Sequence, residues 1–175
     1  MLINKRVVGK EERKVSILQF RKTKEKIVEE VILKNYDRYY RLAYSYVHNE
    51  ADAYDIVQNS AYKAILKADT LKNKEYAQTW VYRIVLNEIF TFCKKDNVIT
   101  FGEMPIEEGK EDTYENLDLK VALEKLSPEE KAVVELRYYE DLKIEEIAEI
   151  LNENVSTVKS RLYRCMKKLR VELEL

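Results

Sequence analysis

Apolar residues recur every three or four positions along most of the chain, which is the spacing of amphipathic helices. The pattern is continuous in residues 27–47, resumes in about residues 52–67, and returns in residues 75–95. Each stretch gathers its apolar side chains on one face, so that the three faces can cover one another. The pattern predicts three helices packed as one bundle.

The boundary between the first two helices carries its own marker. Asn49 has a short polar side chain that can cap free backbone amides, and Asp52 places a negative charge near the positive end of the helix dipole. The polar residues 68–74 then separate the second helix from the third. We therefore expect the second helix to begin just after Asn49.

The second half of the chain contains another marked helix start. Ser127 can cap a helix, Pro128 suits its first position, and Glu130 completes a capping box three residues after the serine. This helix is expected to reach about Tyr139, and a short helix at residues 119–126 should precede it.

Residues 143–164 have the pattern of a helix-turn-helix, a motif whose second helix fits the DNA major groove. Ala148 is small where two crossing helices must approach closely. Asn152 tolerates the left-handed turn conformation that glycine usually supplies. Val158 is the apolar residue that locks the second helix onto the first.

The second helix of this motif is basic on its polar faces. Residues 155–170 contain six basic residues and no acidic one, although the chain of 175 residues has a net charge of −1. A solvated surface helix in such a chain usually mixes both signs, so this pattern favours contact with DNA. The expected buried stripe consists of Val155, Val158, Leu162, Met166 and Leu169.

Charge and turn residues divide the chain. Residues 1–26 hold nine basic and three acidic side chains, whereas residues 96–118 hold one basic and eight acidic ones together with most of the Gly and Pro residues. We therefore predict an all-α fold of two small helical domains: a basic, mobile arm (1–26), a three-helix bundle (27–95), a flexible acidic linker (96–118) and a four-helix domain that contains the helix-turn-helix (119–175).

Several functional classes are disfavoured by composition. His48 is the single histidine, and Cys93 and Cys165 lie in apolar helical stretches, so neither a metal site nor a Cys/His catalytic pair is expected. No phosphate-binding glycine loop is present, and we expect neither a cofactor nor enzymatic activity. Without a membrane span or signal-peptide core, the sequence predicts a cytoplasmic protein.

Several motifs together resemble bacterial sigma-70 family sigma factors of RNA polymerase, in their short extracytoplasmic-function (ECF) form. The resemblance covers about residues 27–95 and 119–172. It rests on YDRYYRLAY (36–44), DAYDIVQNSAYKA (52–64), WVYRIVLN (80–87), LSPEEK (126–131), LRYYEDL (136–142) and VKSRL (158–162). The resemblance implies a factor that directs core polymerase to promoters and helps to open the duplex.

The resemblance assigns promoter contacts to two helices. For the −35 element, the expected residues are Ser156, Thr157, Lys159, Ser160, Arg161 and Arg164. Arginine can bind guanine through two hydrogen bonds, and short hydroxyl side chains can donate to phosphate. For the melted −10 element, the candidates are Tyr76, Trp80, Arg83, Asn87 and Lys94.

Two of the −10 candidates rest on separate arguments. Trp80 offers an aromatic face for an unstacked base, but the same spacing also fits core packing. Asn87 is an amide within a strongly apolar run and needs a hydrogen-bonding partner, which a base edge would supply.

The resemblance also implies contacts with core polymerase. The β′ clamp helices would be held by Asp52, Asp55, Ile56, Gln58 and Asn59. Tyr138 and Tyr139 fit either packing on the β flap or a place in the core. The family further implies an anti-sigma factor, often membrane-anchored, that covers the binding faces, with no direct membrane insertion of the chain itself.

Two other functions remain open at the level of sequence. A plain transcriptional regulator would bind duplex DNA without polymerase, and an all-helical adaptor would use the basic helix to bind an acidic partner. Capture of core polymerase separates both from a sigma factor.

Overall fold

Every secondary-structure element in the described part of the chain is helical. The computed structural model describes the backbone of residues 4–95 and 114–173, and side chains within 23–95 and 118–173. The all-α prediction is confirmed. Most of the predicted linker, residues 96–113, lies outside the described residues, as do the side chains of the predicted arm up to residue 22, so their flexibility and roles stay predictions.

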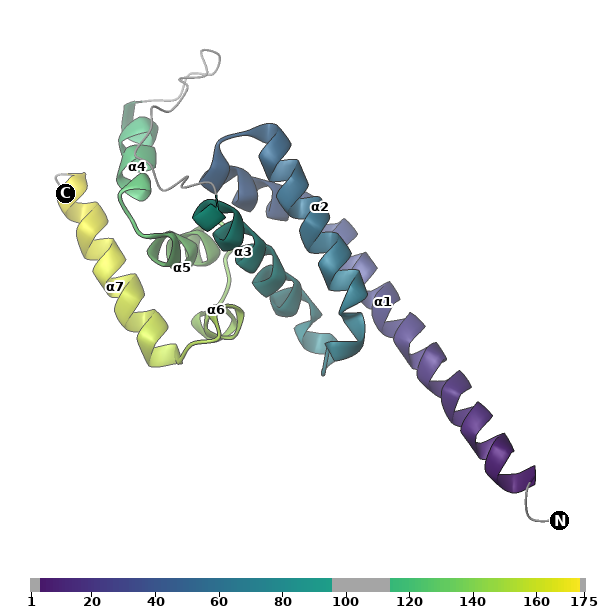
Figure 1. Cartoon of the computed structure of the whole chain (residues 1–175). Helices are drawn as coiled ribbons and strands as arrows, with labels where there is room; N and C mark the ends of the chain where they lie inside the picture. The colour runs from purple at the N-terminus through teal and green to yellow at the C-terminus, as the bar shows by residue number, and fades with distance from the viewer. Residues whose placement is uncertain (1–3, 96–113, 174–175) are drawn as a thin grey trace.

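The first three α-helices form the predicted bundle (Figure 1): α1 (Asn4–Val47), α2 (Glu50–Leu66) and α3 (Ala77–Lys95). The backbone of the predicted arm is continuous with the first helix of the bundle, because α1 is one helix of 44 residues. Its N-terminal part projects away from the bundle.

The turn between α1 and α2 confirms the predicted cap. The side chain of Asn49 accepts a hydrogen bond from the backbone N–H of Asp52 at 3.0 Å, which satisfies a free amide in the first turn of α2. Just before it, His48 has a positive φ of 49° that ends α1. This compact turn allows α2 to fold back along α1.

The connection from α2 to α3 consists of two short 3₁₀ helices, η1 (Ala68–Thr70) and η2 (Lys74–Tyr76). Leu71 lies between them and is buried, which anchors the connection to the bundle. Asn73 caps η2, since its side chain accepts from the backbone N–H of Glu75 at 3.1 Å. The loop therefore delivers Tyr76 to the start of α3 in a defined position.

The second group contains α4 (Tyr114–Glu124), α5 (Pro128–Tyr138), α6 (Ile144–Leu151) and α7 (Val155–Glu172). The capping box at Ser127 is present, with both of its hydrogen bonds to Glu130. Helix α4 begins at Tyr114, inside the predicted linker.

Helices α6 and α7 form the predicted helix-turn-helix. Asn152 ends α6 in the left-handed region with φ 54° and ψ 46°, and its N–H bonds back to the carbonyls of Ala148 and Glu149. Ala148 and Val158 are buried, as the motif requires. One detail differs from the predicted stripe. Cys165 takes the buried position on α7, whereas Met166 is 40% exposed.

The two groups of helices share one apolar core. Tyr39, Tyr82 and Leu86 from the bundle belong to the same buried cluster as Leu136 of α5 and Ile147 of α6. A smaller cluster joins α4, α5 and α7. Since α6 also packs along α3, the helix-turn-helix lies directly against the bundle.

Candidate nucleic-acid interface

The exposed face of α7 carries most of the predicted −35 residues. The solvent-exposed members of that set are Ser156, Thr157, Lys159, Ser160 and Arg164. They project from the second helix of the motif, whose apolar side is held by Val158 and Leu169. This face is basic, accessible and free of acidic residues, which suits the phosphate backbone of DNA.

Arg161 does not share that exposed face. Its two terminal nitrogens each lie 2.8 Å from an oxygen of Glu153, and its side chain is only 15% exposed. The prediction that Arg161 faces a guanine is therefore wrong for this conformation. The sequence reasoning missed the pair because Glu153 approaches Arg161 only after the turn at Asn152 has formed.

Tyr163 is an exposed residue that the sequence reasoning missed. It is 75% exposed on α7, between the basic residues Lys159 and Arg164. A large aromatic ring exposed on a basic helix can pack on base edges or on a thymine methyl group. Its position four residues after Lys159 could have indicated a shared face.

The predicted −10 residues of α3 form one line along the helix. Trp80, Arg83, Asn87 and Lys94 are spaced by three, four and seven residues, and we call this line the α3 stripe. Tyr76 is 49% exposed at the turn before it. Trp80 is half-buried and packs against the core, so the packing alternative holds for part of its ring.

The argument that selected Asn87 is wrong, although the residue itself stays available. Its side chain is exposed and needs no buried partner. Its backbone carbonyl accepts a hydrogen bond from the hydroxyl of Thr91 at 2.6 Å. The side chains of Asn87 and Lys94 are thus accessible to a single DNA strand that runs along α3.

Helix α6 covers part of the α3 stripe. The guanidinium of Arg83 donates to the backbone carbonyl of Glu149, in the last turn of α6. One turn earlier on α3, the hydroxyl of Thr79 lies 3.5 Å from a carboxylate oxygen of Glu149. The carbonyl end of a helix carries partial negative charge, which favours the arginine there.

The predicted polymerase contacts on α2 divide by exposure. Asp55, Gln58 and Asn59 are exposed and Asp52 is half-buried. Ile56 is 1% exposed within the core and is not available to a partner, so its assignment is wrong for this structure. The α-helical spacing of 52–59 places Ile56 on the inner side.

The surface of α2 is also more apolar than the sequence reasoning expected. Four large apolar side chains of α2 are exposed, and we call them the α2 apolar band: Tyr54, Tyr62, Ile65 and Leu66. Near one end of the band, the ring of Tyr54 packs on Tyr40 of α1, with centroids 4.6 Å apart. Exposed apolar side chains gathered in this way are typical of a protein-binding surface.

Tyr138 and Tyr139 at the end of α5 are both exposed, by 56% and 62%. A core role is therefore wrong for these side chains, and a contact with a partner remains a prediction. Within the described residues, no group of three metal-ligating side chains comes together, and no helix is long and apolar enough to cross a membrane.

Comparisons with known proteins agree with this arrangement of helices. Residues 31–98 match the family model Sigma-70 region 2, and residues 116–169 match Sigma-70, region 4. The RNA polymerase sigma factor SigV of Bacillus subtilis (strain 168) is 45% identical over 139 residues, which covers 77% of this chain and 84% of that protein. The chain belongs to the sigma-70 family of RNA polymerase sigma factors. The ECF RNA polymerase sigma factor SigW of the same organism is 28% identical over 161 residues, with 78% and 83% of the two chains covered, and the chain falls in the ECF subfamily.

The fold of this sigma factor is also similar to solved structures. A sigma factor RpoE, crystallised with the anti-sigma factor NepR from Bartonella quintana, aligns over 84% of this chain and 96% of that chain. The TM-score is 0.66 at 23% sequence identity, so the likeness concerns the fold. Sigma factors are transcription initiation factors rather than catalysts, and the ECF function expected from the motifs is confirmed.

Proposed function

We propose that this sigma factor reads the −35 element with the exposed face of α7 and the −10 element with the α3 stripe. The observation that carries this proposal is the face of α7. Five of the six predicted −35 side chains are solvent-exposed on the second helix of a helix-turn-helix that has no acidic residue from 155 to 170. Neutralising phosphates with such a surface releases counterions and drives binding.

Residues on the exposed face divide into two roles. Lys159 and Arg164 supply positive charge to phosphates or guanine edges, while Ser156, Thr157 and Ser160 are short enough to permit close approach. Tyr163 joins them as a candidate for an apolar base contact. Arg161 supports the helix through Glu153 instead of meeting a base.

The proposed polymerase-binding surface is α2. Its exposed polar residues Asp55, Gln58 and Asn59 lie on the same helix as the α2 apolar band. Exposed apolar side chains with polar groups beside them are typical of protein interfaces. We assign the β′ clamp helices to α2, and Tyr138 with Tyr139 to the β flap.

We extend the proposal to regulation by an anti-sigma factor in the cytoplasm, where core polymerase acts. Support comes from the similarity in fold to a sigma factor crystallised with the anti-sigma factor NepR. A membrane anchor on that partner would place the control of this chain at the inner membrane surface.

Run-off transcription tests the proposed function. The purified chain is mixed with sigma-free core polymerase and a library of genomic promoter fragments, and transcripts are mapped at their 5′ ends. We expect transcripts from defined starts that are absent without the chain. Binding to duplex DNA without polymerase capture would support the plain regulator, and capture of an acidic protein with no transcripts would support the adaptor.

A further inference from the structure

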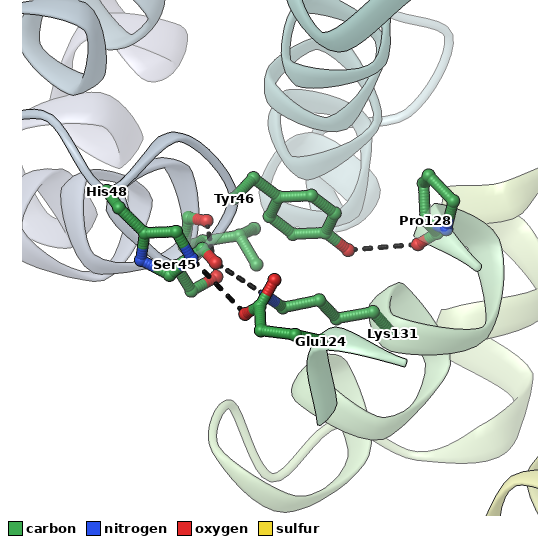
Figure 2. Close-up of polar contacts among 7 residues, drawn as sticks. Ser45, Tyr46, His48, Glu124, Pro128 and Lys131 are labelled. Carbon is green, nitrogen blue, oxygen red and sulfur yellow. Dashed lines mark hydrogen bonds and ion pairs between the residues drawn. The ribbon is translucent and has the colours of Figure 1, made fainter. Parts of the chain in front are cut away.

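Helix α1 has different surroundings at its two ends. Near its C-terminal end, the hydroxyl of Tyr46 donates to the carbonyl of Pro128 in α5 at 3.0 Å (Figure 2). Its N-terminal part runs past the ends of α2 and α3, and no other described element lies beside it (Figure 1). Among the described side chains of α1, the first buried one is Val28. We call residues 4–22, which precede the described side chains, the α1 extension.

The α1 extension leaves the bundle at the connection between α2 and α3. The ammonium of Lys24 donates to the carbonyl of Asp69 in η1 at 2.9 Å, and α1 packs along η1. Leu71, which follows η1, is 2% exposed and holds the connection in place. The same connection ends at Tyr76, just before the α3 stripe. The extension therefore projects from the end of the bundle that holds Tyr76.

The α1 extension is strongly basic. It has seven basic residues and two acidic ones, in a chain whose net charge is −1. The basic residues are Lys5, Arg6, Lys10, Arg13, Lys14, Arg21 and Lys22. The next part of α1, residues 23–30, holds two basic and three acidic residues, so the surplus of positive charge belongs to the projecting part. A solvated helix usually mixes both signs, and this surplus therefore indicates an anionic partner.

Exposed lysines continue the positive charge onto the bundle. Lys67, Lys72 and Lys74 of the connection between α2 and α3 are all exposed. Asp69 and Glu75 are the acidic residues there, so the connection keeps a surplus of one positive charge. A partner that runs along the extension would meet these lysines where the extension joins the bundle.

The pattern of the extension favours nucleic acid over a membrane surface. A helix that lies in a membrane interface needs apolar residues that recur along one face. No large apolar residue lies between Val8 and Val15, an interval of nearly two helical turns. Duplex DNA, in contrast, presents one phosphate charge about every 1.7 Å, and basic side chains suffice to bind it. At about 1.5 Å per residue, the basic residues of the extension span about 25 Å of helix.

We propose that the α1 extension binds the phosphates of duplex promoter DNA that adjoins the −10 element on the side of Tyr76. This contact is separate from the exposed face of α7 and from the α3 stripe. It carries no base specificity, because phosphates are the same at every base pair. The binding rests on the charge and direction of the extension, whereas its place along the promoter rests on the proposed role of the α3 stripe.

The salt dependence of promoter binding tests the proposal. The full chain is combined with saturating core polymerase, and its affinity for a labelled promoter fragment is measured by fluorescence anisotropy over a range of KCl concentrations. Each phosphate contact contributes about 0.9 to the slope of log affinity against log salt. Arg13→Gln together with Lys14→Gln should make the slope shallower by about one to two and lower the affinity at about 0.1 M salt on the order of tenfold.

Two further variants serve as controls for these glutamines. Lys34→Gln with Arg41→Gln removes the same two charges from exposed positions of α1 inside the bundle. Equal slopes in the two double variants would overturn the proposal. Arg13→Lys with Lys14→Arg keeps both charges and should bind as wild type does, since glutamine, lysine and arginine also have similar helix propensities. A loss in this swap as large as in the glutamine pair would contradict phosphate binding.

Directed DNA cleavage locates the contact. An iron chelate attached to Ser16→Cys cuts the DNA that lies near it, while the native Cys93 and Cys165 are buried and protected from labelling. In the complex of holoenzyme and promoter, we expect cuts in the duplex next to the −10 element on the side of Tyr76. Cuts confined to another part of the promoter, or no cuts, would overturn the proposal.

Two other results separate this inference from its rivals. A wild-type chain that gives no run-off transcripts would reject the proposed function, whereas normal transcription with equal salt slopes would reject only the role of the α1 extension. Vesicles of phosphatidylglycerol test the membrane alternative by flotation with the full chain. Flotation that is lost in the glutamine pair, with an unchanged promoter slope, would assign the extension to a lipid surface and overturn the proposal.

Discussion

At the scale of single residues, the pair of Arg161 and Glu153 separates support of the recognition helix from contact with DNA. Arg161→Ala should lower the free energy of unfolding by about 1 kcal/mol, since a partly buried ion pair and one hydrogen bond are lost. Urea unfolding measures this change. Arg164→Ala, at an exposed position, should leave stability unchanged but weaken promoter binding by the holoenzyme. The opposite result would restore Arg161 as a base contact.

Helix caps and turn residues that contact only nearby backbone were predictable from sequence. The caps at Asn49 and Ser127 and the left-handed Asn152 depend on chain neighbours within four positions, and all three were found. The pairing of Arg161 with Glu153 was not predictable, because it needs the geometry of a formed turn. Asn87 was selected for a buried amide and proved exposed, since helix rotation and not local apolarity decides which side faces water.

At the scale of elements, α2 offers the clearest prediction. Tyr62→Ala should weaken capture of core polymerase. The ring of Tyr62 is 68% exposed in the α2 apolar band, so its removal takes contact area from the complex with polymerase and little from the free chain. Tyr163→Ala is the matched control, as its ring is 75% exposed but lies on α7. Affinity for core polymerase, measured by surface plasmon resonance, should fall for Tyr62→Ala alone. Equal affinities for the two variants would move the polymerase surface away from α2.

The types and order of the helices were predictable, but some of their bounds were not. Periodicity identified α2, α3 and α7, whereas the weak pattern before residue 27 hid the continuation of α1 back to Asn4. On α7, Met166 and the adjacent Cys165 both fit a stripe of three-and-four spacing. Packing against α4 and α5 selected the smaller cysteine for the buried position.

At the scale of the whole molecule, Glu135 links stability to pH. Burial of α5 against the bundle raises the pKa of this carboxyl from 4.5 to about 7; Lys131 and Ser45 oppose the rise, while Glu124 and Glu140 add to it. The folded chain thus keeps a proton that the unfolded chain releases. From pH 4.5 to about 7, this group makes the free energy of unfolding fall as pH rises.

Glu135→Gln removes this dependence while keeping a polar side chain next to Ser45. We compare the free energies of unfolding of the variant and wild type by urea unfolding at about pH 5 and about pH 8. The variant's value relative to that of wild type should be higher at about pH 8 than at about pH 5. Glu129→Gln, on an exposed position of the same helix, is the control and should show no such gain. If the two variants respond alike, Glu135 is not protonated in the folded chain.

The two-unit organisation was visible in sequence, but the shared core was not. Composition marked residues 96–118 as a break, and each unit showed its own apolar stripes. Nothing local shows that Leu136 and Ile147 cover Tyr39 and Tyr82, because contacts between units depend on two surfaces that form separately. For the same reason, the sequence placed Arg83 toward DNA and did not foresee its carbonyl partner on α6.

The most direct test of the account is run-off transcription with sigma-free core polymerase, comparing Lys159→Ala with Lys34→Ala. Both lysines are exposed and both changes remove one positive charge, but Lys159 lies on the proposed −35 face and Lys34 on α1. We expect wild type and Lys34→Ala to give transcripts from the same defined starts, and Lys159→Ala to give far fewer. Equal transcript levels from the two variants would contradict promoter recognition by α7.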